Sequence, residues 1–133
     1  MNIKRFGVSL EEDLLKTLDE YSVQNKFPNR SQVIRHLIRK NLVKQRWADD
    51  QEVAGAIVLV YDHHKRDLQH QSTHIQHDFH DLILSVQHVH LDHHHCLETI
   101  AVKGKASRLT DLANQLIGLK GIFHGELVMS GIE

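Results

Sequence analysis

The most chemically suggestive stretch of this sequence holds two histidines separated by one residue, His88 and His90, and the only cysteine, Cys96. Side chains on a strand alternate between its two faces, so both imidazoles would face the same side. A turn at 92–94 would then bring Cys96 beside them on a neighbouring strand. Imidazole and thiolate are transition-metal ligands, and three of them leave one position open. His77 on the preceding helix is the candidate for it, reaching the site only from another subunit.

Histidine makes up 13 of the 133 residues, and eleven of them lie between His63 and His95. Composition alone indicates metal binding of no particular kind. We expect most of these side chains to be exposed, with His63 and His80 as possible secondary ligands. A tetrahedral arrangement would favour Zn²⁺ and a square-planar one Ni²⁺ or Cu²⁺, and the spacing leaves the geometry open.

The overall composition excludes several classes of protein. A hydrophobic content of 41% with 25% charged residues is typical of a globular chain of one or two small domains. No apolar run approaches the roughly 20 residues that span a bilayer, and no secretory signal follows the N-terminus. The single cysteine excludes an internal disulfide and favours a reducing, cytoplasmic setting.

Charge divides the chain into a basic and an acidic part. Residues 1–47 hold ten Lys and Arg against five Asp and Glu, a balance of +5. Residues 48–133 hold six against twelve, a balance of -6. The basic part suggests the DNA phosphate backbone as a partner.

The basic part predicts a strand over 3–10 and helices over 11–24 and 30–46, from the spacing of its apolar residues. Ser9 with Glu12, and Asn29 with Gln32, are spaced as helix caps. A unit of this size has too small a core to fold alone, and its strand has no partner within it. Two copies would pair their strands antiparallel into a ribbon that fits a major groove.

The acidic part predicts four strands and two helices in the order βαββαβ. The strands are expected over 56–61, 82–91, 95–103 and 122–129, with helices over 65–79 and around the leucines of 109–119. This order predicts a ferredoxin-like domain, so the whole chain is α+β. We expect domains at 1–47 and 55–133, joined by a linker at 48–54.

The N-terminal part resembles the ribbon-helix-helix repressors in its alternating Arg5-x-Gly7-x-Ser9 segment and in the Asn29-Arg30-Ser31 start of its second helix. The resemblance implies that the outward strand residues, Arg5, Gly7 and Ser9, touch base edges. Arg5 is the strongest candidate, because its guanidinium can contact guanine O6 and N7 together. The resemblance also implies that a DNA phosphate lies at Asn29, Arg30 and Ser31.

Nearly the whole chain resembles the nickel-responsive transcriptional regulators of the NikR family, most specifically in His77-x₁₀-His88-x-His90-x₅-Cys96. The resemblance implies one square-planar Ni²⁺ per subunit, held by His88, His90 and Cys96 with His77 of a neighbouring subunit. It also implies an ACT-type C-terminal domain and a homotetramer that is a dimer of dimers. Nickel-loaded protein would bind a palindromic operator and repress nickel-uptake genes. We expect nickel to order residues 62–79 and position Lys65 and Arg66 against the DNA backbone.

The sequence departs from the family at Gln32 and His36, where a secondary cation site between the domains uses acidic residues. Gly7 also replaces a residue with a side chain on the reading face. The alternatives are a regulator responding to Zn²⁺, Cu²⁺ or Co²⁺, a metal-binding buffer protein, and an antitoxin. An enzyme is not expected, because no Glu is placed as a general base beside the histidines. No membrane and no protein partner other than copies of the chain are predicted.

Overall fold

The computed structural model describes residues 2–132 and divides into two compact units, Met1–Asn41 and Leu42–Glu133. The first unit contains helix α1 (Glu12–Gln24) and the beginning of helix α2 (Arg30–Ala48). The last residues of α2 belong to the second unit.

Of the two predicted helix caps in the first unit, one is confirmed and one is wrong. The side-chain oxygen of Asn29 accepts the backbone N–H of Gln32 at 2.9 Å, which caps α2. Helix α1 begins at Glu12 with Glu11 as its cap residue and no side-chain capping hydrogen bond. Ser9 therefore stands too far before the first helical turn to cap it.

The strand predicted over 3–10 is not formed within one chain, where these residues have no regular secondary structure. A strand needs the N–H and C=O groups of a neighbour, and the first unit offers none. Phe6, Val8 and Leu10 are accordingly 73%, 59% and 43% exposed. Both helices also expose large apolar side chains, at Leu14, Val23, Leu37 and Ile38.

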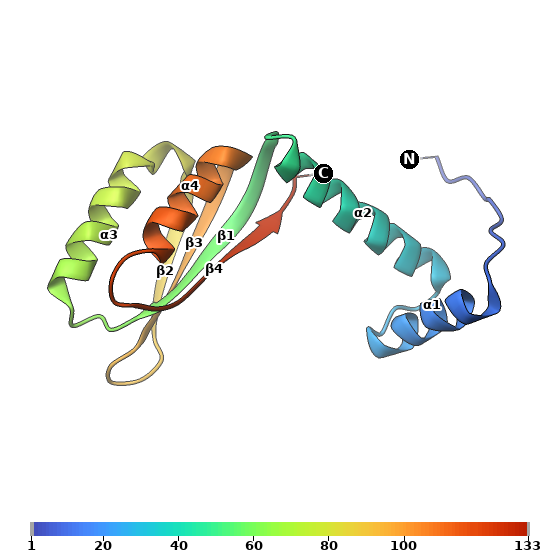
Figure 1. Ribbon diagram of the computed structural model, residues 1–133, viewed down its shortest axis with the longest axis horizontal. Helices are drawn as coiled ribbons and strands as arrows, with labels where there is room; N and C mark the ends of the chain where they lie inside the picture. Colours follow the sequence, from blue (N-terminus) through green and yellow to red (C-terminus); the bar gives the residue numbers. More distant parts are fainter. Residues whose placement is uncertain (1, 133) are drawn as a thin grey trace. The chain divides into compact units, whose positions relative to one another are not determined.

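The second unit is an antiparallel sheet with two helices on one face (Figure 1). Its strands are β1 (Glu52–Tyr61), β2 (Ile83–His90), β3 (Cys96–Lys105) and β4 (Ile122–Ser130), in the spatial order β2-β3-β1-β4. The helices are α3 (Arg66–Asp78) and α4 (Ala106–Ile117), and a 3₁₀ turn, η1 (His80–Leu82), precedes β2. The predicted βαββαβ, ferredoxin-like order is confirmed.

The core of this unit lies between the helices and one face of the sheet. Alternate residues are buried over 57–61 of β1 and 96–102 of β3, and α4 presents a leucine stripe to them. The fully buried side chains of this cluster include Ile57, Leu59, Ile100, Leu109, Leu112 and Leu116.

The end of α2 is also part of this core. Trp47 is 8% exposed, and its indole N–H donates to the carbonyl oxygen of Ser130 at 2.8 Å. The connection between α2 and β1 is shorter than the linker predicted at 48–54, because α2 ends at Ala48 and β1 begins at Glu52. Strand formation continues through 52–54 because Val53 is fully buried in the sheet.

Among the residues that the structure describes, no helix is long and apolar enough to cross a membrane.

Candidate metal centre

The pairing of β2 with β3 brings one histidine against the only cysteine. His88 lies opposite Glu98, and His90 lies opposite Cys96 in the antiparallel register. The Nδ1 atom of His88 is 3.6 Å from the Sγ atom of Cys96. On the other side of β3, Tyr61 at the end of β1 lies opposite Cys96. A nitrogen donor from β2 and a sulfur donor from β3 therefore meet near the edge of the sheet at which β1 and β2 end and β3 begins.

A buried carboxylate orients His88 in this position. Glu98 is 2% exposed, and its Oε1 atom accepts the hydroxyl hydrogen of Tyr61 at 2.7 Å. Its Oε2 atom accepts the side-chain amide of Gln76 at 2.9 Å. The Nε2 atom of His88 lies 2.9 Å from Oε1, where an N–H donates to it. That tautomer leaves the lone pair of Nδ1 directed to the side where the Cys96 sulfur lies.

Burial sets the protonation of the other two groups around Glu98. Desolvation and the neighbouring carboxylate raise the pKa of Tyr61 well above its ordinary value, so its hydroxyl remains a hydrogen-bond donor. Desolvation also raises the pKa of the Cys96 thiol, and the Glu98 charge adds to the rise. A bound cation would reverse this preference, because a metal binds the thiolate and supplies the opposing positive charge. The donors at this position therefore fit a transition-metal ion.

His90 is near this pair by register, but its ring lies against a different residue. The rings of His90 and His63 are 4.5 Å apart between centroids, and His63 in turn lies 4.0 Å from His64. The Nδ1 atom of His63 is buried and has no hydrogen-bond partner among the described residues. Side chains directly opposite on antiparallel strands have Cβ atoms about 5 Å apart, so rotation of His90 would bring it to Cys96.

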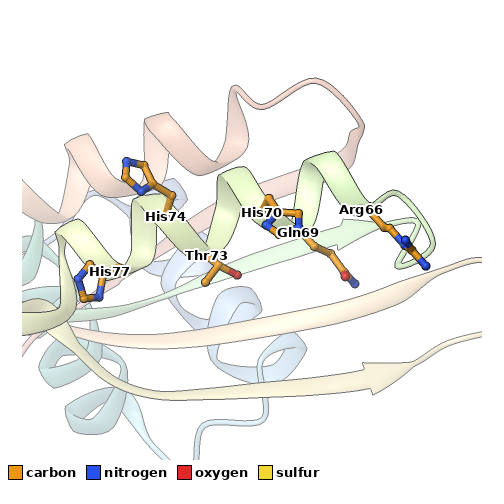
Figure 2. Close-up of a pocket in the computed structure, with 6 residues that line it drawn as sticks. All are labelled: Arg66, Gln69, His70, Thr73, His74 and His77. Carbon is orange, nitrogen blue, oxygen red and sulfur yellow. The ribbon is translucent and has the colours of Figure 1, made fainter.

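His77 does not join His88 and Cys96 within one chain. It lies on the exposed side of α3, near the C-terminal end of the helix, with Arg66 at the other end (Figure 2). Both line a shallow pocket along α3 with Gln69, His70, Thr73 and His74. The ring of His80 is 5.9 Å from that of His77, and its Nδ1 atom lies 3.0 Å from the His77 carbonyl oxygen.

The residues predicted to contact DNA bases, Arg5, Gly7 and Ser9, are all exposed in the segment before α1. Those predicted to contact phosphates differ in what they already bind. The side chain of Asn29 caps α2, and Arg30 makes two hydrogen bonds of 2.9 Å to the carboxylate of Asp19.

Three further phosphate candidates are exposed at helix beginnings. Ser31 lies in the first turn of α2, Lys65 immediately precedes α3 and Arg66 is its first residue. The two departures from the family pattern, Gln32 and His36, lie in the first two turns of α2. The ring of His36 packs against that of Phe27, with 5.1 Å between the ring centroids. The backbone N–H of Gln32 donates to the Asn29 side chain that caps the helix.

Glu98 and Gln76 are the residues that sequence reasoning missed. One signal for Glu98 was present: Cys96, Ile100 and Val102 occupy alternate positions of a buried strand face, and Glu98 is the single charged residue among them. A charge at such a position is costly unless it is paired, which indicates a specific partner. Gln76 gave no comparable signal, because it stands on a polar stretch of α3.

Two family models match the chain, one for each unit. The model described as "NikR C terminal nickel binding domain" matches residues 54–130, and "Ribbon-helix-helix protein, copG family" matches residues 4–45. The chain belongs to the NikR family. A NikR-family relative from Syntrophus aciditrophicus, named "Putative nickel-responsive regulator", is 53% identical over 98% of this chain and 96% of its own length. One with the same name from Desulfovibrio desulfuricans is 52% identical over 93% and 90%.

One solved structure resembles part of this NikR-family chain in fold. An uncharacterized protein from Thermotoga maritima matches with a TM-score of 0.54 at 14% identity, covering 59% of this chain and 98% of that one. The ACT domain of GTP pyrophosphokinase from Chlorobium tepidum matches with a TM-score of 0.49 at 20% identity, covering 59% and 100%.

Proposed function

We propose that this chain is a nickel-responsive transcriptional repressor, with Ni²⁺ as the corepressor. The observation that carries the proposal is the meeting of His88 Nδ1 and Cys96 Sγ, 3.6 Å apart, in a chain whose other unit matches a ribbon-helix-helix model. The nickel-binding family model spans both residues. A DNA-binding unit joined to a metal-binding unit is the organisation that a metal-dependent repressor requires.

One Ni²⁺ would be held in each subunit by Cys96, His88 and His90, and the fourth ligand would be His77 of a neighbouring subunit. The exposed position of His77 on α3 supports this arrangement, because an exposed donor is accessible to another chain. The metal would link two chains in one coordination sphere and so favour one quaternary arrangement. A ligand shifts such an equilibrium only by its different affinity for the two states.

The assembly would be a homotetramer made of two dimers, acting on a palindromic operator of nickel-uptake genes in the cytoplasm. The exposed apolar residues of the first unit support the dimer. Pairing the 3–10 segments of two chains would bury Phe6, Val8 and Leu10 and satisfy the backbone of both strands. Arg5, Gly7 and Ser9 would then lie on the outer face of the ribbon, with Asn29, Arg30 and Ser31 near the flanking phosphates.

A mobility-shift titration with and without Ni²⁺ at fixed salt tests the switch. We expect operator affinity to rise with Ni²⁺ in the native chain and to stay at its metal-free value in Cys96→Ala. Equal affinities with and without Ni²⁺ would exclude a nickel-dependent repressor. A stronger response to Zn²⁺, Cu²⁺ or Co²⁺ would assign a different metal, and nickel binding without DNA binding would indicate a buffer protein.

An absorption spectrum tests the site itself. Thiolate ligation should give a charge-transfer band with Ni²⁺ that is lost in Cys96→Ala. Persistence of the band in that variant would remove Cys96 from the site.

A further inference from the structure

A second group of histidine and carboxylate side chains lies close to the candidate metal centre. Among the described residues, Asp62, His64 and His94 are the one set of three or more His, Cys, Asp or Glu whose donor atoms all lie within 4.8 Å of one another. Asp62 and His64 follow β1, and His94 lies in the turn between β2 and β3. We propose that these three residues form an auxiliary site for a divalent transition-metal ion.

Two of the donors are already in contact. The Oδ1 atom of Asp62 lies 3.1 Å from His64 Nδ1 and also accepts the His64 backbone N–H at 3.0 Å. A cation takes the place of the ring proton between them, and that proton moves to Nε2. His94 brings the third donor from the other loop, and its backbone N–H is held by Asp92 at 2.8 Å.

The donor set determines the class of ion. Two imidazoles and one carboxylate suit Zn²⁺, Ni²⁺ or Co²⁺, whereas Mg²⁺ and Ca²⁺ need mainly oxygen ligands. Three protein ligands leave room for water. Because His64 and His94 are exposed, binding is weaker than at a buried thiolate site.

The auxiliary ion would fix two loops to each other. One is the segment that leads from Tyr61 into α3, and the other is the β2–β3 turn that leads into Cys96. His63 lies between the two sites, with its ring 4.0 Å from His64 and 4.5 Å from His90. The auxiliary site does not depend on nickel binding at the principal one, so the two can fail separately.

Equilibrium dialysis of the full chain against Zn²⁺ alone tests the proposal. The native chain should bind two Zn²⁺ per chain, and the double variant His88→Ala/Cys96→Ala should retain one. Adding His94→Gln to that variant should weaken the remaining site by about 10-fold or more, and Asp62→Asn should weaken it while preserving the turn. His124→Gln, which removes an exposed histidine of β4, is the matched control and should change nothing. Unchanged Zn²⁺ affinity after His94→Gln, or an equal loss after His124→Gln, would overturn the site.

The ring ¹⁵N resonances give a second measurement that does not depend on stoichiometry. Zn²⁺ added to the His88→Ala/Cys96→Ala chain should shift the ring nitrogens of His64 and His94 and leave those of His124 in place. Shifts confined to histidines other than His64 and His94 would contradict the proposal. Far-UV circular dichroism of each variant verifies that it is folded before either measurement.

Discussion

A single buried carboxylate orients the candidate metal centre. Glu98 accepts hydrogen bonds from Tyr61 and Gln76 and lies 2.9 Å from His88 Nε2, so it holds elements from three parts of the unit together. Groups that bind the far nitrogen of a ligating histidine fix its tautomer and its ring orientation. If His88 ligates the proposed Ni²⁺, Glu98 acts as a positioning residue, and its effect should appear in metal affinity.

Replacing Glu98 with Gln tests that role. The amide has nearly the same shape but no charge, so it holds the His88 ring less firmly and makes its Nδ1 a weaker base. We expect Ni²⁺ affinity to fall by about 10- to 100-fold, measured by competition with a chelator. Glu126→Gln, on an exposed position of β4, is the control and should leave the affinity unchanged. If Glu98→Gln lowered only the melting temperature, Glu98 would have a structural role alone.

The buried thiol predicts a pH dependence of metal binding. Burial raises the pKa of Cys96, so its thiol is protonated at neutral pH and must lose that proton to ligate. Nickel affinity should therefore rise by about tenfold per pH unit above neutrality and level off as pH passes the thiol pKa. A chelator-competition titration between about pH 7.5 and 9 measures this slope, where ordinary histidines are already neutral.

Cys96→Ala is the control for that titration. Its residual nickel affinity should be nearly flat over the same range. A native slope as flat as that of the variant would show that no thiol proton is displaced.

At the scale of single helices, Asn29 caps α2 and is also proposed to contact a DNA phosphate, and two substitutions separate these roles. Asn29→Ala removes the hydrogen bond to the Gln32 N–H and should cost about 1 kcal/mol of unfolding free energy. Chemical denaturation measures this loss. Asn41→Ala, an identical change at an exposed position inside α2, should not destabilise the chain.

Asn29→Asp distinguishes capping from DNA contact. Aspartate caps as well as asparagine, so stability should be retained. Its negative charge would repel a phosphate at the same helix end, so operator affinity should fall. Unchanged operator affinity would remove Asn29 from the proposed phosphate contacts.

The order of elements in the C-terminal unit could be predicted from the sequence because its strands and α4 have strong apolar periods. The segment 3–10 could not be settled in the same way, since a strand forms only beside a partner and the described residues of the first unit offer none. At the site, the two-residue period of a strand and the turn that follows it were enough to predict that His88 lies beside Cys96. Residue spacing does not determine rotamers or side-chain packing. It therefore could not predict that the His90 ring lies against His63, or that several side chains gather around Glu98.

At the scale of the whole molecule, the acidic C-terminal unit also contains two of the cations that are proposed to contact DNA phosphates. Lys65 and Arg66 stand at the N-terminal end of α3, five or fewer positions after Tyr61 of the site. If metal binding positions them against the operator, each contributes to the counterions released from DNA.

The salt dependence of operator affinity measures that contribution. In the nickel-loaded protein, Arg66→Gln should weaken binding and reduce the slope of log affinity against log salt by about 1. Lys120→Gln, an exposed lysine after α4, should leave the slope unchanged. An unaltered slope for Arg66→Gln would exclude a phosphate contact there.

The burial of Trp47 decides where the C-terminal unit can be cut for biochemical work. A fragment that starts at residue 49 would contain every strand and yet lack an indole that fills the core and binds Ser130. Removing a buried tryptophan costs about 3–5 kcal/mol, a large share of what holds a small domain together. Thermal melts should therefore find a fragment starting at Leu42 much more stable than one starting at residue 49. A truncated sensor must keep the last two turns of a helix that begins in the DNA-binding unit.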